Sequence, residues 1–312
     1  GGELGGAEDR GSRLTAVVDG RLPVRPADRR AGPSGPYIRR SKGATVPGNG
    51  TTGGFKGAIF DVDGVLVDSP HERAWKEALR ELMEGEWAGI RERSTWSDER
   101  FTSKVYQQMM SGKPRLAGAL SALEYFKVPD AAERAETYGA RKQELLVRLI
   151  EAGEFRAFPD ALRFVMAVKA LGIPTAAASS SKNAGLFLRR IRLDTFAEQE
   201  GLEYEFIRPG LTLLDFLDAD LSGRDLARGK PDPEIFLAAA AELKFPPEEC
   251  FVVEDAVSGI QAAKAGNMAA LGVARANDQD ALAAAHADLV VTSLDEVDVS
   301  RLTEHQLARR SQ

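Results

Sequence analysis

The stretch Gly57-Ala58-Ile59-Phe60-Asp61-Val62-Asp63-Gly64 joins a short apolar run to a pair of aspartates. The apolar residues predict a buried strand, and a strand places side chains two positions apart on the same face. Asp61 and Asp63 should therefore leave the sheet together, and Gly64 permits the sharp turn that must follow. This geometry suits a nucleophile and a proton carrier that act on one reacting group.

Carboxylates this close repel each other, and a shared proton or a divalent cation is the usual remedy. A second apolar run, Cys250-Phe251-Val252-Val253, is followed at once by Glu254-Asp255. Acidic oxygens without a neighbouring histidine or cysteine favour Mg²⁺ over zinc. An aspartate beside such an ion can form an acyl phosphate, so the residues predict phosphoryl transfer. Each acidic pair alone is more typical of a turn or a helix start, and only their combination carries the prediction.

In its motifs and their order the chain resembles the haloacid dehalogenase superfamily of phosphotransferases, over about residues 55 to 298. The resemblance is carried by residues 61–69 (DVDGVLVDS), Ala178-Ser179, residues 229–233 (GKPDP) and residues 253–256 (VEDA). It implies that Asp61 attacks phosphorus, and that Asp63 protonates the leaving oxygen and later deprotonates the attacking water or hydroxyl. It also implies that Ser179 hydrogen-bonds a phosphoryl oxygen and that Lys230 offsets the charge between Asp61 and the phosphate.

The same resemblance implies a set of Mg²⁺ ligands. Asp61 and Asp255 would bind the ion directly, Asp63 through its main-chain carbonyl, and Glu254 through a water or by holding Lys230. Dehalogenases of the superfamily also use an aspartate nucleophile, but they need neither magnesium nor a second aspartate. Asp63 and the Glu254-Asp255 pair therefore argue against a dehalogenase.

Alternating strand and helix patterns predict an α/β fold with a Rossmann-like, mostly parallel sheet. Residues 55–70 and 154–298 should form this core. The helical pattern of residues 71–153 predicts an inserted layer of helices, and the resemblance implies that this layer is an α-helical cap over the active site. The catalytic motifs then all fall at carboxyl ends of strands, where such sheets bind ligands. Residues 299–312 are expected to be a flexible tail. Residues 197–210 are longer than the usual link; a surface hairpin is favoured over a dimer contact or a specificity loop.

Further residues resemble the β-phosphoglucomutase-like subgroup. A substrate with phosphate at both ends needs a second anion site, for which arginine is apt. Each of these residues could equally be a solvated or helix-capping side chain. The predicted substrate-binding residues are His71, Arg115, Arg148, Ser181, Lys182 and Asn183.

Two classes of function follow from these patterns. One is magnesium-dependent phosphoryl transfer on a phosphorylated sugar, either by a mutase or by a phosphatase that shares the first half-reaction. The cap's exclusion of water decides between them, and the sequence does not report it. The other, disfavoured by the intact motifs, is a noncatalytic interaction module.

Composition sets the remaining expectations. The 312 residues are 43% hydrophobic, without an apolar run of membrane-spanning length, so we expect a soluble monomer or homodimer that acts without a membrane. The single cysteine, Cys250, favours a reducing, cytoplasmic compartment.

Charge separates the first residues from the rest. Residues 1–54 carry nine Lys or Arg against five Asp or Glu, so the remaining chain is more acidic than the net charge of −6 indicates. Because an acidic surface repels the phosphates of nucleic acid, nucleic acid is not an expected partner. We expect this basic segment to be disordered, as an artificial or processing remnant or as an arginine-rich organelle transit segment, with the remnant favoured.

Overall fold

The computed structural model describes residues 53–111 and 113–311. Its centre is a six-stranded sheet with the order β5-β4-β1-β6-β7-β8. Every neighbouring pair in this sheet is parallel. The predicted α/β fold class is thus confirmed. The strands are β1 (Gly57–Phe60), β4 (Thr175–Ala177), β5 (Ala219–Asp220), β6 (Cys250–Glu254), β7 (Ala269–Val273) and β8 (Leu289–Val291).

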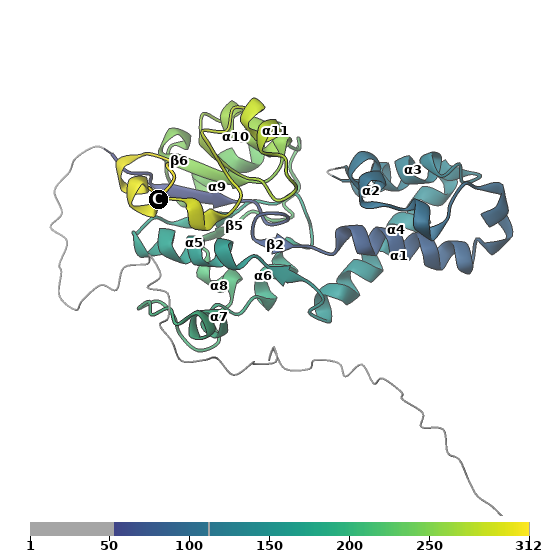
Figure 1. The fold of residues 1–312 in the computed structure, drawn as a ribbon, viewed down its shortest axis with the longest axis horizontal. Helices are drawn as coiled ribbons and strands as arrows, with labels where there is room; N and C mark the ends of the chain where they lie inside the picture. The colour runs from purple at the N-terminus through teal and green to yellow at the C-terminus, as the bar shows by residue number, and fades with distance from the viewer. Residues whose placement is uncertain (1–52, 112, 312) are drawn as a thin grey trace, which may run out of the picture. The chain divides into compact units, whose positions relative to one another are not determined.

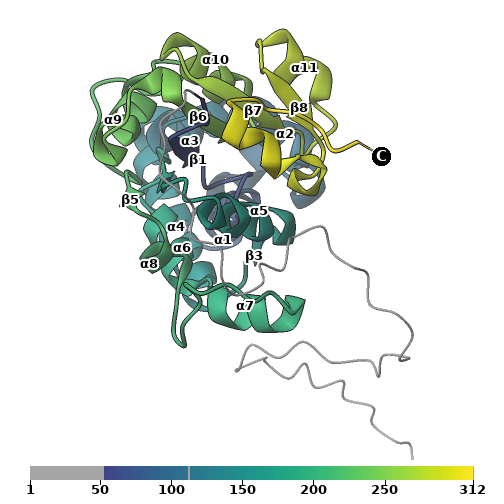
Figure 2. The same ribbon diagram turned by 90° about the vertical axis from the view of Figure 1, so that its left-hand side faces the viewer.

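Helices cover both faces of the sheet (Figure 2). One buried cluster joins Ile59 and Val252 to α9 (Glu234–Leu243), α10 (Val257–Ala265) and α11 (Gln279–Ala284). On the other face, the ring of Phe60 lies 6.1 Å from that of Phe164 in α5 (Pro159–Ala170). Side chains of neighbouring strand residues point to opposite faces, which is why Ile59 and Phe60 belong to different clusters.

The chain between β2 (Val67–Asp68) and β3 (Arg156–Ala157) forms a group of helices, of which α1 and α4 are the longest (Figure 1). The ring of Trp75 in α1 lies 4.9 Å from that of Tyr138 in α4, and the Tyr138 hydroxyl donates to the Trp75 carbonyl at 2.9 Å. β2 and β3 pair antiparallel, so the chain leaves and re-enters the core at adjacent points. The elements are α1 (His71–Glu84), η1 (Ala88–Arg93), η2 (Asp98–Arg100), α2 (Ser103–Met109), α3 (Arg115–Tyr125) and α4 (Ala131–Glu151).

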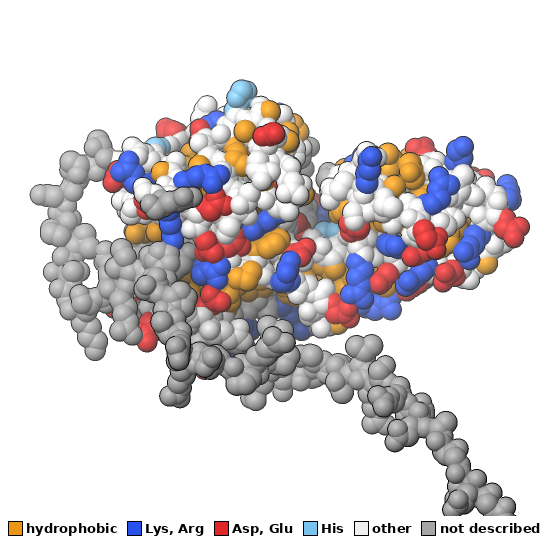
Figure 3. Space-filling model, in the orientation of Figure 1, with side chains coloured by type: hydrophobic (Ala, Val, Ile, Leu, Met, Phe, Trp, Pro, Cys, Tyr) orange, Lys and Arg blue, Asp and Glu red, His pale blue; other side chains and the backbone are white. Residues whose placement is uncertain are grey.

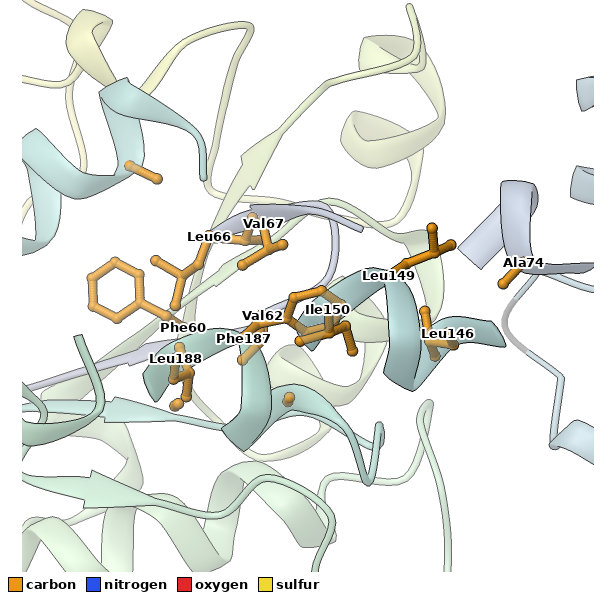
Figure 4. Close-up of a cluster of buried hydrophobic side chains, with 14 of the residues drawn as sticks. Phe60, Val62, Leu66, Val67, Ala74, Leu146, Leu149, Ile150, Phe187 and Leu188 are labelled. Atoms are coloured by element: carbon orange, nitrogen blue, oxygen red, sulfur yellow. The ribbon is translucent and has the colours of Figure 1, made fainter. Parts of the chain in front are cut away.

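A buried apolar cluster joins the end of α4 to the core (Figure 4). Leu149 and Ile150 belong to the same cluster as Val62, in the loop after β1, and Phe187, in α6 (Ala184–Arg190). The remaining elements of the core are α7 (Leu193–Glu200), α8 (Leu213–Phe216), η3 (Pro247–Glu249), η4 (Leu294–Glu296) and η5 (Val299–Glu304).

The structure corrects two expectations. Residues 197–210 form no hairpin, because α7 runs to Glu200 and the rest is a loop in which the ring of Tyr204 stacks on that of Phe206 at 4.9 Å. The end of the chain is not a flexible tail, because Leu302 in η5 is fully buried and residues 297 and 309 form a β-bridge. Apolar side chains in both segments pack onto the core, which loop length and polarity did not reveal.

The segment predicted to be disordered, residues 1–54, lies almost entirely outside the described residues. Within the described ranges, no helix combines the length and the apolar character that crossing a membrane requires. On the face shown in Figure 3, side chains of both charges are intermixed over the described residues.

Candidate active site

The carboxyl ends of three adjacent strands bring the predicted catalytic residues together. β1 lies between β4 and β6, so Asp61, Ser179 and Glu254 meet at one edge of the sheet. The Asp61 amide donates to the carbonyl of Val253 at 3.0 Å, which continues the ladder between β1 and β6 up to residues 61–66, the predicted catalytic loop. Asp61 is 6% exposed and Ser179 3%, so the site is largely shielded from water.

Lys230 links two of the carboxylates. Its Nζ donates to Oδ1 of Asp61 at 2.6 Å and to Oε1 of Glu254 at 2.5 Å. Burial by itself would lower the pKa of Lys230, but the two carboxylates outweigh it and hold the pKa above its usual value. The ammonium therefore stays charged, as a fixed cation beside Asp61.

Glu254 binds both Lys230 and the backbone that follows β6. Besides holding Lys230, it accepts hydrogen bonds at Oε2 from the amides of Asp255 and Ala256, each at 3.0 Å. Its carboxylate lies against Gly259 in α10, where a Cβ atom would stand 1.9 Å from the Glu254 Cδ. Only glycine fits there, so Glu254 is held in place by both its charge partner and its packing.

Glu254 also belongs to an acidic cluster that is suited to a metal ion. Oxygen atoms of Asp61, Glu254 and Asp255 all lie within 4.8 Å of one another. Burial first, and then the neighbouring carboxylates, raise the pKa of Asp61 to about 7 and that of Asp255 well above its usual range. Lys230 alone does not balance three carboxylates, so the donor set fits a hard divalent cation such as Mg²⁺.

The carboxylate of Asp63, predicted as a proton carrier, is turned away from this cluster. Its Oδ2 accepts from the Ser179 hydroxyl at 3.4 Å, and its Oδ1 lies 3.4 Å from Nε2 of His71. Burial alone would raise the pKa of Asp63, but His71 outweighs it and the pKa is lowered. Asp63 is thus ionised at neutral pH, the state that a general base requires. Its side chain would not bind the metal, in keeping with a role for its carbonyl alone.

Lys142 was missed by the sequence analysis. Its Nζ lies 2.9 Å from Nδ1 of His71 and 5.1 Å from the centre of the Trp75 ring. An ammonium can only donate, so Nδ1 of His71 accepts and the ring proton sits on Nε2, facing Asp63. Burial lowers the pKa of Lys142 to about 8. A signal was present, since Lys142 shares the buried face of α4 with Tyr138 and Leu145.

Of the other predicted substrate-binding residues, three follow Ser179 in the chain, and the amide of the first, Ser181, donates to the Ser179 hydroxyl oxygen at 3.1 Å. Ser181 caps a turn, accepting from the Asn183 amide at 3.3 Å, and Lys182 pairs with Asp225 at 2.8 Å on the surface. Asn183 exchanges two hydrogen bonds with Gln143 of α4, at 2.7 and 3.2 Å.

The two arginines lie on the helices of the inserted segment. Arg115 is exposed at the start of α3, with its stem packed along Gly139 of α4. Arg148 is exposed on α4, and its side chain has no hydrogen bond or ion pair within the described ranges. The structure therefore connects Lys142 to Asp63 through His71, whereas Arg148 is exposed on α4.

A family model for haloacid dehalogenase-like hydrolases matches residues 55–267. The chain belongs to the haloacid dehalogenase superfamily. Within it, the chain falls in the β-phosphoglucomutase-like subgroup, as predicted. A beta-phosphoglucomutase of Mycobacterium bovis is 33% identical over 261 residues, which cover 78% of this chain and 91% of that protein. A crystal structure of an archaeal beta-phosphoglucomutase from a hyperthermophilic Pyrococcus species has a TM-score of 0.57 at 31% identity, covering 79% of this chain and 96% of that one.

Phosphatases occur among the relatives of this haloacid dehalogenase superfamily member as well. A phosphorylated carbohydrates phosphatase of Thermotoga maritima is 27% identical over 215 residues, covering 69% of this chain and 82% of the relative. The chain is therefore an enzyme, a phosphotransferase or hydrolase of the superfamily, and the hypothesis of a noncatalytic module is not supported.

Proposed function

We propose that this enzyme is a phosphotransferase of the β-phosphoglucomutase type, which moves phosphate on a hexose phosphate through an aspartyl phosphate on Asp61. One observation carries the proposal: the chain of contacts from Lys142 through His71 to Asp63. It ties the state of the proton carrier to residues of the inserted helices. A mutase must transfer the phosphoryl group of the aspartyl phosphate to a sugar hydroxyl and not to water. Its general base should therefore become active only when the sugar occupies the site.

In the proposed first half-reaction, a carboxylate oxygen of Asp61 bonds to phosphorus as the bond from phosphorus to the sugar oxygen breaks. Asp63, which is ionised in the resting site, would first take up a proton and then deliver it to that leaving oxygen. In the second half-reaction, a sugar hydroxyl attacks phosphorus, its proton passes to Asp63, and the Asp61 carboxylate leaves. Lys230 and the Ser179 hydroxyl stabilise charge on the phosphoryl oxygens throughout.

Asp61, Asp255 and the carbonyl of Asp63 would hold Mg²⁺, with Glu254 fixing Lys230 beside them. The ion would neutralise charge on the transferring phosphoryl group. By holding the crowded carboxylates ionised, it would keep Asp61 nucleophilic at neutral pH, in spite of the raised pKa of its carboxyl.

A second candidate is a phosphatase on a phosphorylated sugar. Lys182 and Asn183 are engaged with protein partners and Arg148 is exposed, so the second anion site that a mutase needs is not assembled around Asp61. A phosphatase acting on a monophosphate needs one anion site. The same first half-reaction would then be followed by attack of water on the aspartyl phosphate.

One experiment separates these candidates. The full chain is given β-glucose 1-phosphate, Mg²⁺ and a trace of glucose 1,6-bisphosphate, and products are followed by phosphorus NMR. A mutase accumulates glucose 6-phosphate, whereas release of free phosphate alone leaves the phosphatase. The Asp61→Asn variant is the control and should be inactive but folded; activity in that variant would contradict the assignment of the nucleophile.

A further inference from the structure

Arg275 lies next to the catalytic loop, and its hydrogen bonds and ion pair go to Gly64, Val65 and Asp160 rather than to the acidic cluster. It follows β7 by two positions, and its side chain is 18% exposed. Its guanidinium binds Asp160 with both arms, Nη1 to Oδ2 at 2.9 Å and Nη2 to Oδ1 at 3.2 Å. Such a planar, two-bond pairing fixes the orientation of the guanidinium as well as its position.

The same guanidinium faces the backbone that follows Asp63. Nε lies 3.4 Å from the carbonyl oxygen of Gly64, and Nη2 lies 3.5 Å from that of Val65. These bonds are long, so each is weak. Together they place a partly buried positive charge against two carbonyls next to the proton carrier.

Arg275 is itself held from two other sides. Asp160, at the start of α5, accepts from the Leu294 amide at 2.8 Å and from the Ser293 hydroxyl at 3.2 Å. The ring of Phe158 lies 4.0 Å from the guanidinium, and the Phe158 amide donates to the carbonyl of Leu66 at 3.0 Å. The arginine thus joins the catalytic loop to α5 and to the chain that follows β8.

The catalytic loop is tightly packed at Gly64. Gly64 adopts a φ of +86°, and its Cα is packed directly against the carboxylate of Asp255. A small shift of the Gly64 and Val65 carbonyls would move Asp63 relative to Ser179 and His71. Misplacement of reacting groups by about 1 Å can cost on the order of a hundredfold in rate.

We propose that Arg275 is a positioning residue for the loop that carries Asp63, and that Asp160 acts by holding Arg275. The proposal deepens the function proposed above and rests on it. Lysine cannot replace Arg275, because one ammonium cannot pair with both oxygens of Asp160 and also reach two carbonyls.

The test measures kcat and KM for a phosphate ester with Arg275→Met, Arg275→Lys and Asp160→Asn. Both arginine variants should lose about ten- to a hundredfold in kcat, with KM changed less than about twofold, because the loop is misplaced but the phosphate site is kept. Adding Asp160→Asn to Arg275→Met should cost little more, since the two residues act as one unit. Rescue by Arg275→Lys would contradict the proposal.

Arg163→Met is the matched control. Arg163 is 21% exposed and pairs with Asp295 and Glu200, without a contact to the catalytic loop. It should lower the melting temperature and leave kcat unchanged. An equal loss of kcat in both variants would show that general destabilisation, and not positioning, is responsible.

Amide hydrogen exchange gives a readout independent of turnover. Arg275→Met should speed exchange in a peptide covering residues 62–68, whose amides at Gly64, Leu66 and Val67 close the loop, and Arg163→Met should not. A parent chain that turns over no phosphate ester would sink the proposed function, whereas unchanged exchange in Arg275→Met would sink the positioning role by itself.

Discussion

A Cβ atom on Gly64 would lie 1.9 Å from Oδ2 of Asp255, so the loop after β1 and the loop after β6 are in direct contact. The contact joins the segment that carries the nucleophile and the proton carrier to the segment that would hold the metal. Because Gly64 and Asp255 pack directly against each other, neither can move without the other. The integrity of this contact is open to direct test.

Gly64→Ala should abolish most of the turnover. The new methyl collides with Asp255, and the φ of +86° also strains any residue other than glycine. We expect a loss of about a hundredfold in kcat, from misplacement of the metal ligand. Gly172→Ala is the matched control, because Gly172 has a φ of +79° but open space around it. That variant should lose stability by a similar amount and retain its kcat; equal losses of kcat would mean that strain alone is responsible.

Binding of Mg²⁺ should depend strongly on pH. Burial raises the pKa of Asp61 to about 7 and that of Asp255 well above its usual value, so protons compete with the ion on both groups. The apparent Kd for Mg²⁺ should fall about tenfold for each pH unit and proton released as pH rises toward about 7. Calorimetric titration at several pH values measures this. A Kd that is constant between about pH 5.5 and 7.5 would contradict the raised pKa values.

The stability of the metal-free protein should fall as pH rises, whereas its affinity for Mg²⁺ should increase. A carboxyl whose pKa is raised on folding binds its proton more tightly in the folded state. Stability is then full below the unfolded pKa of 3.8 and is lost as pH rises toward about 7. Urea unfolding in EDTA should therefore show a lower free energy of unfolding at pH 7.5 than at pH 5.5, and saturating Mg²⁺ should remove most of the difference.

Lys230→Met should destabilise the fold without metal. It leaves Asp61 and Glu254 buried without their shared cation, and breaking such a pair costs about 3–5 kcal/mol. The loss should shrink at low pH, where the carboxylates take up protons. Lys182→Met, which breaks the exposed pair with Asp225, should leave the free energy of unfolding close to the parent value. A Lys230→Met variant as stable as the parent at pH 7.5 would show that Lys230 does not neutralise this site.

Lys142→Met should alter the pH profile of turnover. The pKa of Lys142 is lowered to about 8 by burial, so its ammonium holds Nδ1 of His71 only below that pH. In the parent enzyme kcat should decline above about pH 8, and this decline should be absent in the variant. At neutral pH the variant should be about tenfold slower, with more free phosphate among its products, as His71 no longer orients Asp63.

Arg141→Met is the neighbouring control for this prediction, because Arg141 lies next in the chain but pairs with Glu81 of α1. Its pH profile should match that of the parent. A decline above pH 8 that persists in Lys142→Met would assign it to another group.

Much of the catalytic core was predictable because its signals are local. The run before Asp61 predicted a buried strand, and the run at residues 269–273 predicted a strand with the bounds that β7 has. By contrast, β5 is only two residues long and escaped prediction, since so short a segment shows no alternation. The loop between α7 and α8 was predicted as a surface hairpin because insertions in such loops are usually surface material. Its aromatic contacts with the core leave no periodic pattern in the sequence that could have corrected this.

The sequence alone determined which reactive side chains are available. They are a pair of aspartates after one strand, an acidic pair after another, and Lys230, four residues before a helix begins. Only the tertiary structure decided which other side chains serve them. Lys142 and Arg275 are separated from their partners His71 and Asp160 by long stretches of chain, and their roles depend on how the strands and helices pack. Strand and helix periodicity is set by neighbouring residues, whereas a contact between distant segments is set by register and packing, which no local pattern records.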